Sequence, residues 1–258
     1  MSESKYQADK AKLVALNISK SYGTKAILKD INIEAKQNEI IALLGPNGAG
    51  KTTSFYIIVG ILSATSGKIL FNDTDITCYP LYMRSKLGIG YLPQEASIFR
   101  KLSVEDNLKI ALEAKYGNDK QTINQHMEQL LDEFNIQHIR KSIGGVLSGG
   151  ERRRVEVARI LAINPTFLLL DEPFAGVDPI AVDDIKNLIL SLKQKGIGVI
   201  ITDHNVRETL EIVDRAYILF DGKIICHGNP KDIVKNEQVR QVYLGKDFEI
   251  KQHKSNNT

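Results

Sequence analysis

The chain has 258 residues, of which 43% are hydrophobic and 25% charged, and its formal net charge at pH 7 is +3. This is the composition of a globular protein with a sizeable core. No window approaches 18 apolar residues, which argues against a membrane span, and the densest basic run, Arg152–Arg154, is shorter than a nucleic-acid footprint, so we expect no nucleic-acid partner.

The ends of the chain and its two cysteines point to a protein of a reducing compartment. Residues 1–12 are polar and contain no apolar stretch like that of a signal peptide, and we expect residues 1–12 and 251–258 to be flexible. Cys78 and Cys226 fit no metal-ligand spacing and are interpreted as free thiols. Any membrane role would therefore come through a partner.

The first elements are predicted to be strands, followed by a helix. Short alternating runs at 13–18 and 27–35, separated by Tyr22-Gly23, indicate an edge of strands. The continuous apolar run 40–44 is typical of a strand buried on both faces. A helix should follow from Lys51 to about Leu62.

The middle of the chain changes character and is predicted to be a helical insert. Residues 104–147 carry apolar side chains at helical spacing, as in Met127, Leu130, Leu131 and Phe134. A further helix is expected at 152–161.

The remaining elements predict a parallel sheet with a hairpin beside it. Apolar strands at 167–170 and 197–202 flank a helix at 180–195, which makes a βαβ unit. A hairpin at 216–226 should turn at Asp221-Gly222, and a last helix is expected at 230–243. The fold class is thus α/β, with a mixed β core, an antiparallel β edge and a helical insert over about residues 100–160.

A phosphate-binding loop is predicted between the strand 40–44 and the helix that follows. The run from Gly45 to Thr52 fits G-x-x-x-x-G-K-[ST] in the context that this motif requires. Its glycines let backbone N–H groups face one point, and the helix N-terminus adds partial positive charge. The predicted nucleotide contacts are Gly45, Pro46, Asn47, Gly48, Ala49, Gly50, Lys51, Thr52 and Thr53, with Lys51 on the β- and γ-phosphates and the Thr52 hydroxyl on Mg²⁺.

Two acidic residues follow the predicted strand 167–170. Asp171 would hold Mg²⁺, directly or through water, and Glu172 would polarise the water that attacks the γ-phosphate. Acids at a helix start are the ordinary alternative, and the presence of Lys51 argues against it.

The run Leu147-Ser148-Gly149-Gly150-Glu151 precedes a predicted helix, and here the chain resembles the ABC ATPases, a family of P-loop NTPases with an LSGG(Q/E) signature motif. The phosphate loop, the signature and the acidic pair occur in the order of that family, and the resemblance covers one domain over residues 13–250. It implies that Tyr22 stacks on adenine, that Gln94 contacts Mg²⁺ and the attacking water, that residues 175–178 form the D-loop, and that His204 contacts the γ-phosphate.

The same resemblance implies a homodimer. In the family, Ser148, Gly149, Gly150 and Glu151 would bind the γ-phosphate of ATP held by the other subunit's Lys51, so that two ATP molecules close the dimer. Hydrolysis would then open it and drive partner proteins.

At a finer level, the runs 88–99, 201–210 and 242–248 resemble the branch of the family that serves lipopolysaccharide export. This implies a place on the cytoplasmic face of the inner membrane, and LptF/LptG-like integral membrane subunits bound near Phe99 and Arg100. A branched-chain amino-acid importer ATPase is the main alternative. A DNA or ribosome ATPase is disfavoured by the short span between Lys51 and Ser148 and by the single cassette, and a non-hydrolysing module by Glu172 and His204.

Overall fold

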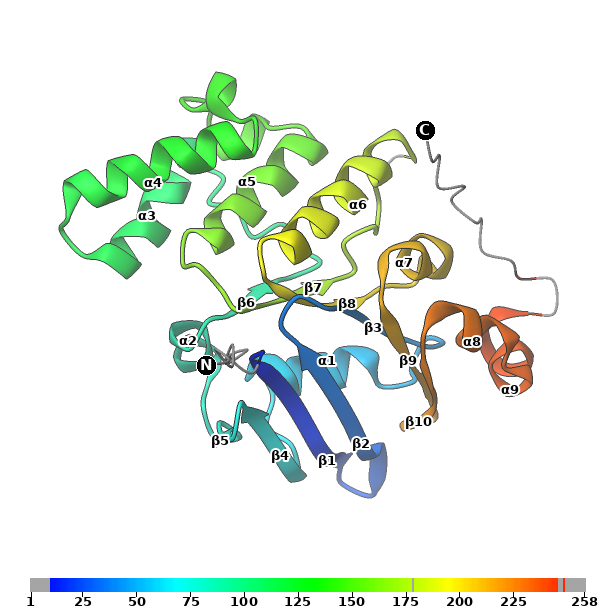
Figure 1. Ribbon diagram of the computed structural model, residues 1–258. Coiled ribbons are helices and arrows are strands. Elements are labelled where there is room, and N and C mark those ends of the chain that lie inside the picture. Colours follow the sequence, from blue (N-terminus) through cyan, green and yellow to red (C-terminus); the bar gives the residue numbers. More distant parts are fainter. Residues whose placement is uncertain (1–9, 178, 246–247, 249–258) are drawn as a thin grey trace, which may run out of the picture.

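The computed structural model describes residues 10–177, 179–245 and 248, and they form two sheets with helices between and above them (Figure 1). One sheet is antiparallel, with strand order β2-β1-β4-β5. Its strands are β1 (Lys12–Tyr22), β2 (Lys25–Lys36), β4 (Ser66–Phe71) and β5 (Thr74–Asp75). The predicted edge of strands is confirmed.

The second sheet carries the strand ends on which the site is built. Within the described residues it has the order β10-β9-β3-β8-β7-β6. Its strands are β3 (Ile40–Leu44), β6 (Ile89–Leu92), β7 (Phe167–Asp171), β8 (Gly198–Thr202), β9 (Arg215–Phe220) and β10 (Lys223–Gly228). All neighbours pair in parallel except β10, which pairs with β9 in the predicted hairpin.

Helices cover both faces of this second sheet (Figure 1). The helix α1 (Lys51–Val59) lies between the two sheets, and the insert helices stand on the opposite face. The others are α2 (Leu81–Lys86), α3 (Val104–Tyr116), α4 (Lys120–Glu133), α5 (Gly149–Leu161), α6 (Pro179–Gln194), α7 (Val206–Ile212), α8 (Pro230–Lys235) and α9 (Glu237–Val239), followed by a π-helical turn, Arg240–Leu244.

The pleat of β3 divides the core in two. Ile41 and Leu43 pack with α1 and the antiparallel sheet, whereas Ile40, Ala42 and Leu44 pack with the helices on the other face. Every residue of β3, β7 and β8 is buried, as their unbroken apolar runs predict for strands covered on both sides.

Three predicted helix bounds were wrong. The helix α1 ends at Val59 rather than near Leu62, because Gly60 adopts a left-handed φ of 85° that terminates it. The helix α5 begins at Gly149 rather than Arg152, because the Ser148 side chain caps it. The predicted last helix is divided, because the backbone of Asn236 is extended and its side chain caps α9 instead.

Among the described residues, no helix is both long and apolar enough to cross a bilayer. Both cysteines are free. The predicted flexible segment 251–258, most of 1–12, and Asp178 of the predicted D-loop lie outside the described residues.

Candidate functional site

Four parallel strands end at one edge of the second sheet, and each is followed by predicted site residues. The loop 45–50 follows β3, and Gln94 comes two residues after β6. Asp171 ends β7 with Glu172 directly after it, and His204 comes two residues after β8. In the parallel register Asp171 lies beside Thr202, and Leu43 lies on the other side of the same residue. Neighbouring parallel strands bring their carboxyl ends together, so the predicted motifs converge.

The phosphate loop has the form of an anion site. No side chain caps the N-terminus of α1, where Gly50 has φ 105°, so the first N–H groups of the helix remain available to an anion. Lys51 is 7% exposed, and its ammonium donates to the carbonyls of Gly45 (2.7 Å) and Pro46 (3.1 Å). Burial lowers the pKa of Lys51, and the charges of Glu172 and Asp203 oppose that shift. Lys51 is therefore held inside the loop.

Two predicted catalytic side chains, those of Gln94 and His204, meet at the carboxylate of a third, Glu172. The Gln94 amide Nε2 donates to Glu172 Oε2 at 2.7 Å, and His204 Nδ1 lies 3.3 Å from the same oxygen. Glu172 Oε1 makes no hydrogen bond or ion pair with the described residues, which leaves it available to a water molecule. Glu172 also has a left-handed φ of 46°, an uncommon conformation for a side chain of this kind that marks functional sites.

Asp171 is a buried carboxylate at the same edge. It is 4% exposed, and Tyr91 of β6 donates its hydroxyl to Asp171 Oδ2 at 3.3 Å. Burial raises the pKa of Asp171 to about 6, although the hydrogen bond from Tyr91 works in the opposite direction. Because burial disfavours the charged form of Asp171, a cation bound beside this carboxylate would stabilise it.

The donor set fits Mg²⁺. Asp171 supplies a carboxylate and Thr52, on the first turn of α1, an exposed hydroxyl. Gln94 uses its amide nitrogen on Glu172, which leaves its carbonyl oxygen for a metal. Oxygen donors of this kind, few in number and completed by phosphates and water, are what Mg²⁺ prefers. No cluster of three or more metal-binding His, Cys, Asp or Glu side chains occurs among the described residues.

Asp203 orients the segment that carries His204. Its side chain is fully buried and accepts from the backbone N–H groups of Phe174 (2.9 Å) and Asn205 (2.7 Å). It thus joins the turn after β7 to the turn after β8. Burial raises its pKa, and these two backbone donors oppose the shift.

The signature residues form the start of α5. Ser148 and Glu151 make a capping box in which each side chain binds the other's backbone N–H, at 3.3 and 2.9 Å. A cavity of about 460 Å³ is lined by Ser148, Gly149 and Gly150 together with Gln94 and Glu172. The signature of the same chain therefore lies beside the Glu172 carboxylate.

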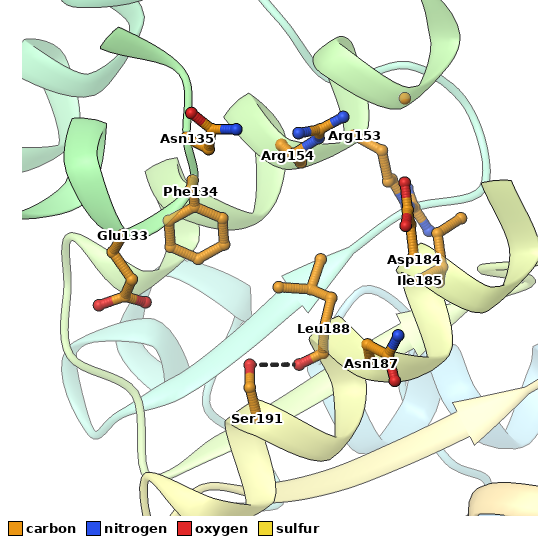
Figure 2. A pocket seen from close by; sticks show the side chains of 11 residues that line it. Glu133, Phe134, Asn135, Arg153, Arg154, Asp184, Ile185, Asn187, Leu188 and Ser191 are labelled. Atoms are coloured by element: carbon orange, nitrogen blue, oxygen red, sulfur yellow. Dashed lines mark hydrogen bonds between the residues drawn. The ribbon is translucent and has the colours of Figure 1, made fainter.

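A second cavity continues along α5. About 330 Å³ in volume, it lies between the end of α4, α5 and α6, with Phe134, Leu188 and Ile185 as its apolar lining and Arg154 at its rim (Figure 2). Five residues line both cavities: Gly150, Arg153, Arg154, Asp184 and Ile185. The end of α4 in the insert and the helix α6 on the parallel sheet thus face each other across a groove next to α5.

Side chains of α5 hold the loop that carries Gln94. Arg153 donates to the Pro93 carbonyl (3.3 Å), and buried Glu156 accepts from the N–H groups of Ser97 (2.7 Å) and Ile98 (3.2 Å). Arg159 donates to the Ser97 hydroxyl at 2.8 Å. Since three successive turns of α5 contact the loop, the two should move together.

One predicted site residue, Tyr22, belongs to the antiparallel sheet. Tyr22 ends β1 with 54% of its surface exposed, and its ring is contacted by Lys20 at 5.1 Å. Its stacking on adenine stays a prediction. Sequence reasoning missed Tyr91 and Asp203, although both lie in runs that it singled out. The sequence offers one sign of each: a polar side chain near the end of a buried strand (Tyr91) or directly after one (Asp203).

The chain is similar in sequence to known proteins. Residues 28–175 match the family described as "ABC transporter", and residues 223–249 match "Branched-chain amino acid ATP-binding cassette transporter". The chain is 53% identical to the "Lipopolysaccharide export system ATP-binding protein LptB" of Haemophilus influenzae, over 92% of this chain and 99% of that protein. It is 53% identical to the protein of the same name from Escherichia coli K12, over 93% and 100%.

A solved structure is also similar. The ADP conformation of MJ1267, an ATP-binding cassette of an ABC transporter, superposes with a TM-score of 0.81 at 29% identity and covers 92% of this chain and 99% of that one. The antiparallel sheet, parallel sheet and helical insert described above are thus the fold of such cassettes.

Proposed function

Because this chain belongs to the ABC transporter family of ATP-binding proteins, we propose that it is the ATP-hydrolysing subunit of a transporter that exports lipopolysaccharide. The observation that carries hydrolysis is the meeting of Gln94, Glu172 and His204 at one carboxylate oxygen beside the phosphate loop. Lipopolysaccharide as the cargo rests on 53% identity over nearly the full length of proteins that bear that name.

The geometry supports a sequence of steps in these side chains. Lys51 would exchange the carbonyls of Gly45 and Pro46 for oxygens of the β- and γ-phosphates. Glu172, held at Oε2, would accept a proton from water through Oε1 as that water attacks the γ-phosphorus. The bond to the leaving ADP oxygen breaks, and ADP and inorganic phosphate result. His204, which lies beside the Glu172 carboxylate, would contact the γ-phosphate and report its presence to the rest of the fold.

Asp171, Thr52 and Gln94 would hold Mg²⁺. When bound, this ion neutralises charge on the β- and γ-phosphates. Tyr91 would keep the Asp171 carboxylate aimed at the site, because its hydroxyl holds the oxygen Oδ2.

We propose a homodimer with two composite sites, in which Ser148, Gly149, Gly150 and Glu151 of one subunit meet ATP on Lys51 of the other. The capping box supports this role, because it fixes the first turn of α5 and leaves the Gly149 and Gly150 N–H groups at a helix N-terminus, an ordinary place for phosphate.

Mixing a Ser148→Arg chain with a Lys51→Ala chain should restore ATPase activity that neither has alone. In the heterodimer, one site combines an intact Lys51 with an intact Ser148. With random pairing, half the dimers carry one such site, so we expect about a quarter of wild-type turnover. A chain carrying both substitutions, mixed with itself, is the control. Mixtures in which heterodimers are detected but no turnover appears would contradict the composite site.

We propose that Phe99 and Arg100 anchor the membrane subunits. The Phe99 side chain is 48% exposed although its backbone is fixed, since buried Asn107 both donates to and accepts from it at 3.1 and 2.8 Å. The Arg159 guanidinium lies 5.1 Å from the ring centroid. An exposed aromatic ring on a rigid support suits an interface anchor better than a place in the insert's core.

Phe99→Ala should abolish co-purification with the membrane subunits while the isolated chain folds normally. Removing this half-exposed ring should cost far less stability than the roughly 3–5 kcal/mol lost when a buried phenylalanine is changed to alanine. Equilibrium unfolding and a pull-down measure the two quantities. The exposed Tyr82, changed to alanine, is the matched control. Complex formation that survives in the stably folded Phe99→Ala variant would refute the anchor.

We place the protein on the cytoplasmic face of the inner membrane, recruited by those LptF/LptG-like subunits. The direct test of cargo is reconstitution of the purified complex in vesicles. ATP-dependent release of lipopolysaccharide to an acceptor is expected, and release of branched-chain amino acids instead would favour an importer.

A further inference from the structure

Glu172 and His204 both lie just beyond the ends of their strands. Glu172 is the first residue after β7, and His204 is the second residue after β8. Their side chains lie 3.3 Å apart, measured from Glu172 Oε2 to His204 Nδ1. Because regular strand pairing ends before both residues, other contacts must hold the two segments at this separation.

The Asp203 carboxylate supplies one such contact to each segment. Its side chain is fully buried. Its oxygen Oδ2 accepts from the N–H of Phe174, two residues after Glu172, at 2.9 Å, and Oδ1 accepts from the N–H of Asn205, directly after His204, at 2.7 Å. Asp203 Oδ1 also lies 3.9 Å from His204 Nδ1, which is too long for a hydrogen bond. Asp203 therefore acts on both functional side chains through the backbone.

The points that Asp203 holds are themselves well anchored. Phe174 is 2% exposed and packs in the core cluster that contains β7. Asn205 is the residue from which α7 begins. Directly before Asp203, the Thr202 carbonyl accepts from the N–H of Glu172 at 2.7 Å. A change in the Asp203 side chain should therefore shift one segment relative to the other.

We propose that Asp203 is a positioning residue that sets the separation of the Glu172 carboxylate and His204. The inference rests on the proposed function, because this separation matters for turnover only if Glu172 activates water and His204 contacts the γ-phosphate. An ionised carboxylate suits the place, because it offers two acceptor oxygens and no donor to two backbone N–H groups. A carboxamide would turn its NH₂ group toward one of them, and a hydroxyl has a single oxygen.

The test compares the full-length chain with its Asp203→Asn and Asp203→Ser variants. Asparagine keeps the shape and one acceptor oxygen, whereas serine keeps only the short contact that a hydroxyl makes two residues along the backbone. We expect kcat to fall roughly tenfold for asparagine and roughly 10²-fold for serine, the order of loss that a misplacement of about 1 Å causes. ATP affinity, measured by equilibrium titration, should not fall, because Lys51 and the phosphate loop keep their contacts.

A double-mutant cycle with Glu172→Gln separates positioning from a merely structural role. If Asp203 acts by placing the Glu172 carboxylate, its loss matters little once that carboxylate is gone. Adding Asp203→Ser to Glu172→Gln should therefore slow single-turnover hydrolysis by less than about twofold more. Losses that multiply would overturn the inference, as would wild-type kcat in the Asp203→Ser chain. The nearly isosteric Asp203→Asn variant serves the same cycle if the serine variant does not fold.

Asp214→Ser is the matched control. Asp214 also joins two segments, because its carboxylate accepts from the N–H of Ile40 at 2.9 Å, but it does so at the start of β3, the end away from the site. Its kcat and ATP affinity should equal those of the wild type. Failure of the proposed function is distinct: the wild type would then not hydrolyse ATP, or Glu172→Gln alone would leave turnover near normal.

Discussion

Glu172→Gln should reduce ATP turnover by roughly 10²-fold or more while ATP still binds, because general base catalysis typically supplies 10²–10⁴. The substitution keeps the size of the side chain and the hydrogen-bonding distance to Gln94, so the phosphate loop and Lys51 are undisturbed. What is lost is a carboxylate able to accept the proton of the attacking water. Steady-state phosphate release measures turnover, and equilibrium titration measures binding.

The same variant should accumulate as an ATP-bound dimer, because the γ-phosphate that joins the two subunits is no longer removed. Size-exclusion chromatography with and without ATP detects it. Glu95→Gln, an exposed neighbour of Gln94, is the matched control and should stay within about twofold of wild type. Near-normal phosphate release by the Glu172→Gln chain would remove Glu172 from its assigned role.

Arg84→Leu should lower the free energy of unfolding by about 3–5 kcal/mol, because it removes the donor from several buried carbonyls and each unsatisfied buried acceptor costs roughly 1–3 kcal/mol. Arg84 is 2% exposed, and among the described residues its guanidinium donates only to backbone carbonyls: those of Ile57 (2.7 Å), Ile58 (2.6 Å), Thr77 (2.9 Å) and Tyr79 (2.8 Å). Burial lowers the pKa of Arg84 to about 10. Leucine would fill part of the space and leave these carbonyls unsatisfied.

Two of those carbonyls belong to the last turn of α1, the helix that begins at Lys51. A cation there is favoured by the helix dipole, so Arg84 closes the far end of the phosphate-binding helix. Arg84→Lys keeps the charge but not the planar set of donors, and should lose an intermediate amount. Urea unfolding measures all three chains. The exposed Arg100, changed to leucine, should cost less than about 0.5 kcal/mol, and a similar small cost for Arg84→Leu would contradict the assigned hydrogen bonds.

The prediction from sequence succeeded where a signal lay within a few consecutive residues. The strands β3, β7 and β8 are unbroken apolar runs, and the phosphate loop between β3 and α1 carries its own glycines. The strand β4 and the helices α2 and α7 were not predicted, because Ser66–Phe71, Leu81–Lys86 and Val206–Ile212 are short and mix polar with apolar residues. Their structure depends on what they pack against.

The contacts within the site could not be predicted from local pattern alone. That Gln94, Glu172 and His204 would share one site was expected only from family resemblance, and their meeting at a single oxygen depends on the left-handed turn at Glu172. The Tyr91 contact with Asp171 follows from the register in which Leu92 lies beside Leu170. Arg84 was overlooked because arginine is almost never fully buried.

The place of β3 in the sheet also constrains how the protein is made. Its hydrogen-bonding neighbours are β8 and β9, and the pair Ile40 and Val199 is separated by 199 − 40 = 159 positions. At about 5–20 residues per second, a ribosome needs roughly ten to thirty seconds to synthesise that interval. Until then β3 has neither neighbour, and a five-residue apolar strand with two open edges remains exposed in the nascent chain. ATP cannot assist folding during this time, since the loop that would bind it is anchored only when the last quarter of the chain emerges.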